Sequence, residues 1–188
     1  MKFNPYIHHR RSIRLKNYDY SQPGAYFITI CTENRECLFG NVVDGKMVLN
    51  DVGQIAQKCW LEIPNHFPNV VLDEFVIMPN HIHGIIILTN DNKNPIVGAN
   101  NHSPLQSQNT SQFRSPSKSI GSIVRGFKIG VIKLIRQNVG AKNILPLQIW
   151  QRNYYEHIIR NEQNLNKIRE YIINNPLKWE VDKYYSEK

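Results

Sequence analysis

Residues 70–88 read Val-Val-Leu-Asp-Glu-Phe-Val-Ile-Met-Pro-Asn-His-Ile-His-Gly-Ile-Ile-Ile-Leu. Apolar and β-branched residues dominate on both sides of Pro79-Asn80, which predicts two strands, at about 70–78 and 81–88. The Pro-Asn pair favours a tight connection between them. We therefore expect two adjacent strands at the centre of the chain.

The elements before and after these strands place them in a larger sheet. Setting a small hairpin aside, the order is strand, helix, strand, strand, helix, strand, which is ferredoxin-like. The expected elements are a strand at 24–32, a hairpin at 42–49 that turns at Asp44-Gly45, a helix that Asn50 or Asp51 caps and Pro64 ends, a helix from Ser119 to about 137, a strand between 147 and 159, and a helix from near Asn161 to just before Pro176.

The predicted fold class is α+β: a ferredoxin-like (RRM-like) antiparallel sheet with helices on one face, plus a C-terminal helix. Such a sheet can leave its other face open, and chemistry could take place there. We expect one domain over residues 1–188. It carries a basic N-terminal arm at 1–20 and a flexible insert at about 90–117 that is rich in Asn, Ser, Gln and Pro.

The composition excludes several classes of protein. The longest aliphatic run covers residues 85–88, far short of the roughly 20 residues of a membrane span. The N-terminus has no apolar secretory segment. Three cysteines without a C-x-x-C pair are typical of reduced thiols. We therefore expect a cytoplasmic protein with no membrane partner.

Positive charge is concentrated in two segments. The 23 Lys and Arg residues outnumber the 15 Asp and Glu residues, for a net charge of +8 and a pI near 9.4. No acidic residue occurs between Asp91 and Glu156. Acid-poor segments of this kind favour a polyanionic partner, although a solvated surface is the simpler alternative. The residues expected to contact such a polyanion, a nucleic acid, are Arg10, Arg11, Arg14, Lys118, Arg125, Lys128, Arg136 and Arg152.

His81 and His83 form the densest chemical signal. Side chains alternate along a strand, so both imidazoles project from one face while Ile82 points into the core. Two neutral imidazoles side by side can chelate one divalent metal; two buried structural histidines are the alternative. Gly84 leaves room for a ligand or a helix to approach.

The last helix offers a third ligand and a reacting group. Tyr171 lies at the margin of its apolar stripe, and Asn175 lies one turn further on the same side. The asparagine oxygen can ligate a hard cation, and the phenol can attack a phosphodiester beside it. Tyr154 and Tyr155, in or beside the last strand, are rival nucleophiles. Each of these residues, taken alone, is also consistent with an ordinary structural role.

The combination of H-x-H, Tyr-x-x-x-Asn and a basic surface resembles the single-tyrosine HUH transposases. The similarity is greatest to their REP-associated branch, the REP-associated tyrosine transposases. The segments that carry the resemblance are Gly24-Ala25-Tyr26-Phe27-Ile28-Thr29, Val76-Ile77-Met78-Pro79-Asn80-His81-Ile82-His83, Trp150-Gln151-Arg152-Asn153-Tyr154-Tyr155-Glu156-His157-Ile158-Ile159-Arg160 and Ile168-Arg169-Glu170-Tyr171-Ile172-Ile173-Asn174-Asn175-Pro176.

This resemblance implies a metal-dependent, single-stranded DNA endonuclease and strand transferase that acts beside repeat (REP-like) hairpins. Tyr171 would be the catalytic nucleophile and form a 5′-phosphotyrosine link. His81, His83 and Asn175 would hold Mg²⁺ or Mn²⁺. The insertion-sequence relatives usually carry glutamine where Asn175 stands. The resemblance also implies a nucleoid-associated location and a monomer or homodimer.

Three other interpretations stay open on the sequence. A host-domesticated nickase would cleave hairpins without moving its own gene. A non-catalytic single-stranded nucleic-acid-binding module would bind by stacking, with Tyr26 and Phe27 exposed on the sheet. A metalloenzyme acting on a small molecule would not depend on DNA.

Overall fold

The computed structural model describes residues 18–90, 118–138 and 148–185. At its centre is one antiparallel sheet with the strand order β4-β5-β1-β6. β4 and β5 pair as adjacent strands, as predicted, and β1 pairs with both β5 and β6. The strands are β1 (Gly24–Cys31), β4 (Val70–Ile77), β5 (His81–Leu88) and β6 (Tyr155–Ile159).

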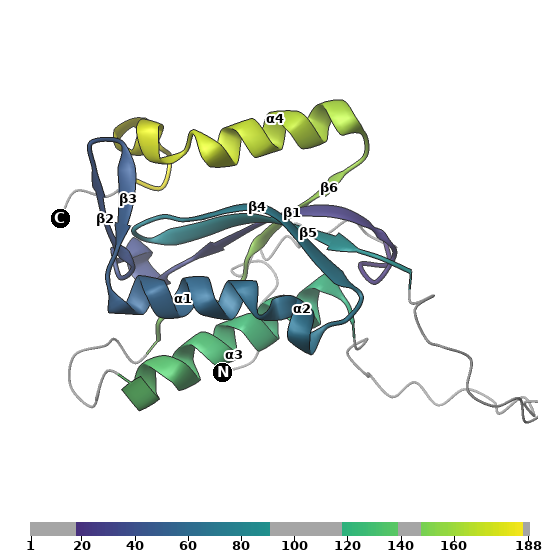
Figure 1. Cartoon of the computed structure of the whole chain (residues 1–188), viewed down its shortest axis with the longest axis horizontal. Coiled ribbons are helices and arrows are strands. Elements are labelled where there is room, and N and C mark those ends of the chain that lie inside the picture. Colours follow the sequence, from purple (N-terminus) through teal and green to yellow (C-terminus); the bar gives the residue numbers. More distant parts are fainter. Residues whose placement is uncertain (1–17, 91–117, 139–147, 186–188) are drawn as a thin grey trace, which may run out of the picture.

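The helices cover both faces of this sheet (Figure 1). α1 (Asp51–Leu61) and α3 (Ile120–Asn138) lie on one face, and α4 (Glu162–Ile173) lies on the other. The predicted ferredoxin-like arrangement with an additional C-terminal helix is thus confirmed.

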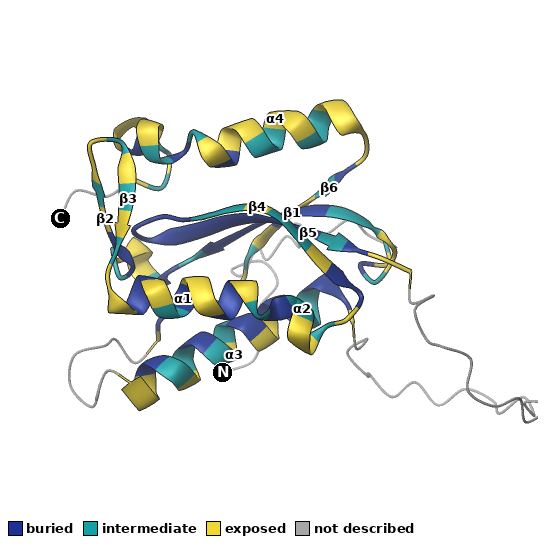
Figure 2. Cartoon of the chain, viewed as in Figure 1, coloured by how far each residue is buried: buried dark blue, intermediate teal, exposed yellow. Residues whose placement is uncertain are grey.

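The larger core lies between the sheet and helices α1 and α3, where Figure 2 shows the facing sides as buried. Ile82 of β5 is fully buried in it, as expected. Gly84 faces the same way, and a Cβ there would lie 2.3 Å from the ring of Trp60 in α1. The room that this glycine provides is therefore filled by a helix, on the face opposite the histidines.

A smaller apolar cluster lies on the second face of the sheet. Phe27, Ile85 and Ile159 contact Ile172 of α4 there, and Leu165 and Ile168 pack against them. The expectation of an open face is therefore wrong. Exposed apolar side chains on a sheet are unfavourable in water, and the apolar side of α4 covers them.

Two predicted boundaries shift, while a third is as expected. The Asn50 side chain caps α1 by accepting a hydrogen bond from the Gly53 amide, as expected. Pro64 does not end this helix, because α1 already stops at Leu61 and Pro64 lies in the first turn of the short helix α2 (Ile63–His66), where proline is tolerated. β6 begins only at Tyr155, while Trp150 forms an isolated bridge to Thr32.

A separate two-stranded sheet consists of β2 (Gly40–Val43) and β3 (Lys46–Leu49). Its turn residues Asp44 and Gly45 have φ angles of 49° and 69°, as the Asp-Gly signal predicts. Two 3₁₀ segments complete the described chain: η1 (Glu33–Arg35) and η2 (Pro176–Val181). None of the described helices is long and apolar enough to cross a membrane.

Two expectations fall outside the described residues. They concern the insert at 91–117 and most of the basic arm, with Arg10, Arg11 and Arg14.

Candidate active site

His81 and His83 project from β5 toward α4. Their side chains are almost fully buried, and their ring centroids lie 4.5 Å apart. The prediction that they share a face is confirmed, since they lie opposite the face to which Ile82 contributes.

Asn80 fixes the orientation of the His81 ring. The Asn80 side-chain nitrogen donates to the carbonyl oxygens of Arg35 (3.1 Å) and Tyr184 (2.7 Å). Its oxygen is then left to face Nδ1 of His81 at 2.8 Å. A neutral imidazole that donates from Nδ1 carries a lone pair on Nε2. That Nε2 is buried and has no hydrogen-bond partner among the residues that the structure describes.

His83 is held from both sides. Its Nδ1 lies 2.9 Å from the hydroxyl oxygen of Thr29 on β1. Its Nε2 lies 3.1 Å from the phenol oxygen of Tyr171 on α4. The structure therefore brings the predicted tyrosine to the predicted histidine pair, 88 residues apart in sequence.

Asn175 and Asp182 complete the cluster. The Asn175 side-chain nitrogen donates to Oδ2 of Asp182 at 3.1 Å, and the Tyr184 amide donates to Oδ1 at 2.7 Å. Asn175 is close enough to His81 and Tyr171 to shift the pKa of each. Its oxygen is buried, and no described residue lies within hydrogen-bond geometry of it.

These groups fit a divalent cation. One ligand atom each from His81, His83 and Asp182 lie within 4.8 Å of one another. The buried, unpartnered atoms beside them, Nε2 of His81 and the oxygen of Asn175, both offer lone pairs. Burying acceptors without a donor is costly, and a cation would satisfy them. Imidazole, carboxylate and amide oxygen are ordinary ligands for such ions.

Burial sets the protonation of this site. It lowers the pKa of both histidines, and that of His83 falls well below its usual value. Both rings are therefore neutral at pH 7, as metal ligation requires. Burial, followed by the charges of Asp182 and Tyr184, raises the pKa of Tyr171 to about 12. A nearby cation would oppose that shift.

The rival tyrosines have other contacts, although Tyr155 lines the same hollow as Tyr171. The Tyr154 hydroxyl donates to Glu156 at 2.9 Å, and its ring packs against the larger core. Tyr155 is 44% exposed and contacts the edge of Phe27. Hydrogen-bond geometry thus favours Tyr171 as the group beside the histidines.

The two aromatic rings that were expected to stack on nucleic-acid bases are not exposed. Tyr26 is fully buried in the larger core, and Phe27 is 9% exposed beneath α4. Neither ring is available to a nucleic-acid base, so this part of the non-catalytic alternative is wrong.

The predicted cations that the structure describes lie mainly on or near α3, on the face opposite Tyr171. Arg125, Lys128 and Arg152 line one hollow there. Lys118 and Arg136 are exposed outside it. Lys178 and Lys183 instead line the hollow at Tyr171, and neither was predicted from the sequence.

No family model matches the chain. An uncharacterized protein of Haemophilus influenzae is 51% identical over 185 residues, which cover 98% of this chain and 97% of the relative. A second protein of that organism, named "Putative REP-associated tyrosine transposase", is 24% identical over 166 residues, or 87% of this chain and 77% of its own. Among solved structures, a REP-associated tyrosine transposase bound to a REP hairpin matches 88% of this chain and 74% of its own, with a TM-score of 0.57 and 19% identity.

The fold is similar to that of a solved tyrosine transposase. Within that class, the resemblance to the REP-associated tyrosine transposases is confirmed. The chain belongs to one family with the 51% identical Haemophilus influenzae protein.

Proposed function

We propose that this protein is a metal-dependent, single-stranded DNA endonuclease and strand transferase of the transposase type. It cleaves beside repeat hairpins through a 5′-phosphotyrosine intermediate. As an enzyme acting on chromosomal DNA, it works in the cytoplasm at the nucleoid.

The contact between Tyr171 and His83 carries this proposal. A phenol on a solvent-facing helix rarely needs a buried imidazole partner, yet here its oxygen lies 3.1 Å from Nε2. Tyr171 is 39% exposed, so a phosphodiester can approach it from outside. This position between solvent and a buried cluster of candidate ligands supports a role for Tyr171 as the nucleophile of covalent catalysis.

His81, His83 and Asp182 would hold the cation, with the oxygen of Asn175 beside them. When bound, Mg²⁺ or Mn²⁺ offsets charge on the scissile phosphate and favours the ionised phenol. Asn80 and Thr29 hold the two rings in position, which preserves the geometry during turnover.

The proposed reaction needs only Tyr171, the DNA strands and water as reactants. The Tyr171 oxygen attacks phosphorus and the P–O3′ bond breaks, so the phosphate stays on tyrosine and a 3′-hydroxyl leaves. The phenol proton passes to water and a proton reaches the leaving oxygen. A second 3′-hydroxyl can then attack the phosphotyrosine, which restores both the phosphodiester and the phenol without an external energy source.

Two further observations support the proposal. The related solved structure is a REP-associated tyrosine transposase bound to a REP hairpin. The contact from Tyr171 to His83 forms within one chain, which supports chemistry by a monomer. A homodimer in which the tyrosine helix of one copy serves the histidines of the other is the alternative.

The test uses a labelled hairpin DNA with single-stranded flanks, the full chain and Mn²⁺, followed by a denaturing gel. The wild type should give a slower band of protein covalently joined to DNA, together with a cleaved strand ending in a 3′-hydroxyl. Chelation should abolish both products. Tyr171→Phe should remove the adduct while hairpin affinity is retained.

Tyr154→Phe and Tyr155→Phe serve as matched controls. Each removes one hydroxyl, and both variants should still form the adduct. An adduct that survives Tyr171→Phe but disappears in one of these controls would show that the nucleophile is assigned wrongly. If the protein binds the hairpin DNA but forms no covalent adduct under any condition, it is a non-catalytic nucleic-acid-binding protein.

A further inference from the structure

We infer that single-stranded DNA leaving the Tyr171 site passes around the β6 edge of the sheet and ends in a basic hollow on the α3 face. This inference rests on the proposed function. It adds a second binding site, on the opposite face of the sheet from the chemistry, and a path that joins the two.

The path begins at the nucleophile. A hollow of about 390 Å³ opens beside Tyr171 and Tyr155 and carries the cations Lys178 and Lys183. Lysine side chains at this place can contact the phosphates next to the scissile one.

The middle of the path follows the outer strand of the sheet. Among the described strands, β6 pairs only with β1, so none of them covers its other edge. A hollow of about 380 Å³ lies along it, lined by Tyr20, Tyr155, His157 and Arg160 among others. An uncovered edge presents backbone donors and acceptors, which can bind a polar chain as it turns.

The path ends on the other face. A hollow of about 430 Å³ lies between α3 and the segments at 18–20 and 152–154. Arg125, Lys128 and Arg152 supply positive charge there. The Lys128 ammonium donates to the carbonyls of Gln151 (2.8 Å) and Asn153 (3.1 Å), so it ties α3 to the segment that leads into β6.

Neighbouring hollows share a lining residue. Tyr155 lines both the first and the second, and Tyr20 lines both the second and the third. Figure 1 shows why the path must bend: α4 and α3 lie on opposite faces, and β6 runs between them. A flexible single strand can follow such a bend, whereas a stiff duplex cannot.

The chemistry of the lining suits single-stranded DNA. Cations outnumber acids along the path: six Lys and Arg residues line the three hollows, against Asp19, Glu156 and Asp182. Tyrosines recur along the path, and aromatic rings beside a positive groove bind unpaired bases without sequence preference. The Lys and Arg residues lining the three hollows are Arg125, Lys128, Arg152, Arg160, Lys178 and Lys183.

The experiment compares hairpin DNAs whose single-stranded tails are about 2 or about 12 nucleotides long, a range that spans typical site sizes. Fluorescence anisotropy measures affinity at several salt concentrations, with tails on the 5′ or 3′ side tested separately. For the wild type, the longer tail on one side should increase affinity about tenfold. In Arg125→Glu/Arg152→Glu this gain should disappear, and the salt slope should fall by about 0.7 for each phosphate that the variant no longer neutralises.

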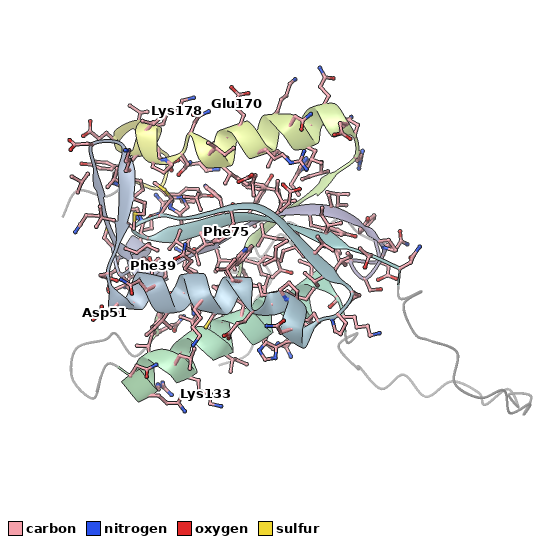
Figure 3. All side chains as sticks on the ribbon, in the orientation of Figure 1. Phe39, Asp51, Phe75, Lys133, Glu170 and Lys178 are labelled. Atoms are coloured by element: carbon pink, nitrogen blue, oxygen red, sulfur yellow. The ribbon has the colours of Figure 1, made fainter. Side chains whose placement is uncertain are left out.

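Lys133→Glu is the matched control. Lys133 is an exposed cation of the same helix, labelled in Figure 3, but it lines a different hollow between α2 and α3. This variant should keep the tail-dependent gain. Circular dichroism and thermal melting confirm folding, and the milder Arg125→Ala/Arg152→Ala replaces the charge reversal if that variant unfolds.

The outcomes separate this inference from the proposed function. A tail-dependent gain that persists in both double variants overturns the path, whatever the cleavage result. A missing adduct in the wild type overturns the proposed chemistry, while the tail comparison still reports on the path.

Discussion

The phenol oxygen of Tyr171 lies 3.1 Å from Nε2 of His83, and Nδ1 of the same ring is engaged with Thr29. The nitrogen that would ligate a cation is therefore the one that the phenol contacts. Since one lone pair cannot serve both at once, cation binding and this hydrogen bond exclude each other. A cation held by His83 would thus leave the phenol free to meet a substrate.

Tyr171→Phe should consequently bind Mn²⁺ more tightly than the wild type. The hydrogen bond that the cation must displace is worth about 0.5–1.5 kcal/mol, so the gain in affinity should reach at most about tenfold. Calorimetry or the Mn²⁺ electron paramagnetic resonance signal measures it without DNA. Tyr155→Phe should leave the affinity unchanged. Weaker binding in Tyr171→Phe would show that the phenol assists the cation.

Asp182 and Asn175 compete for the position of third ligand, and their substitutions separate the two roles. If Asp182 ligates directly, Asp182→Asn should lower Mn²⁺ affinity by at least about tenfold, because a charged ligand becomes neutral. Asn175→Ala should have a smaller effect by removing the hydrogen bond to Asp182. Glu180→Gln, an exposed acid of η2, should have none. A larger effect of Asn175→Ala would restore the asparagine as the main ligand.

Much of the site was predictable because it follows local rules. Strand alternation placed His81 and His83 on one face, and helical spacing placed Tyr171 near Asn175. Asp182 gave no such signal. It lies in the C-cap of a 3₁₀ segment, among alternating charged and aromatic residues without a period, and it reaches the histidines only because α4 returns across the sheet.

The covered face was missed for a related reason. Phe27, Ile85 and Ile159 are apolar on the side of the sheet that faces α4. Their strands are rich in apolar residues on both faces, which can indicate double coverage. A strand buried on both faces has no clear alternation, so the sequence did not show which helix would cover which side.

Asn80 and Thr29 should each control the tautomer of one histidine. Asn80→Ala removes the acceptor at Nδ1 of His81, and Thr29→Val removes the hydroxyl at Nδ1 of His83. Long-range ¹⁵N–¹H correlation spectra report the tautomer of each ring. Asn80→Ala should change the tautomer of His81 only, and Thr29→Val that of His83 only. Each variant therefore serves as the control for the other.

These two variants should also lower Mn²⁺ affinity, by about 10–100-fold, as the loss of groups that orient ligands usually does. Unchanged tautomers with unchanged affinity would mean that packing alone holds the rings.

Gly84 should be intolerant of a side chain. A Cβ there would lie 2.3 Å from the buried ring of Trp60, so Gly84→Ala should cost about 1–3 kcal/mol through overpacking. Gly130→Ala is the matched control, since its Cβ would meet its nearest atom at 3.9 Å. Within α3 that change should stabilise by up to about 1 kcal/mol. Urea unfolding measures the change in the free energy of unfolding for both variants. Changes of the same sign and size would contradict the close packing of Gly84 against Trp60.

Arg169 should fix the helix that carries Tyr171. Its guanidinium donates to both carboxylate oxygens of Asp73, at 2.8 and 2.6 Å, where a register shift interrupts the pairing of β4 with β5. Arg169→Lys cannot reproduce the two parallel hydrogen bonds. It should lower the melting temperature, speed hydrogen exchange in α4 and slow adduct formation. Lys167→Ala, an exposed cation of the same helix, should change none of these.

The difference between wild type and Arg169→Lys should depend on pH with a defined sign. The hydrogen bonds from Arg169 hold the pKa of Asp73 below its usual value. The folded state therefore gains stability that is complete above the ordinary aspartate pKa and is lost as the pH falls through the lowered one. Melting curves recorded from neutral to acidic pH should converge for the two proteins at the acidic end. A constant gap across that range would mean that Asp73 is not the group through which Arg169 holds α4.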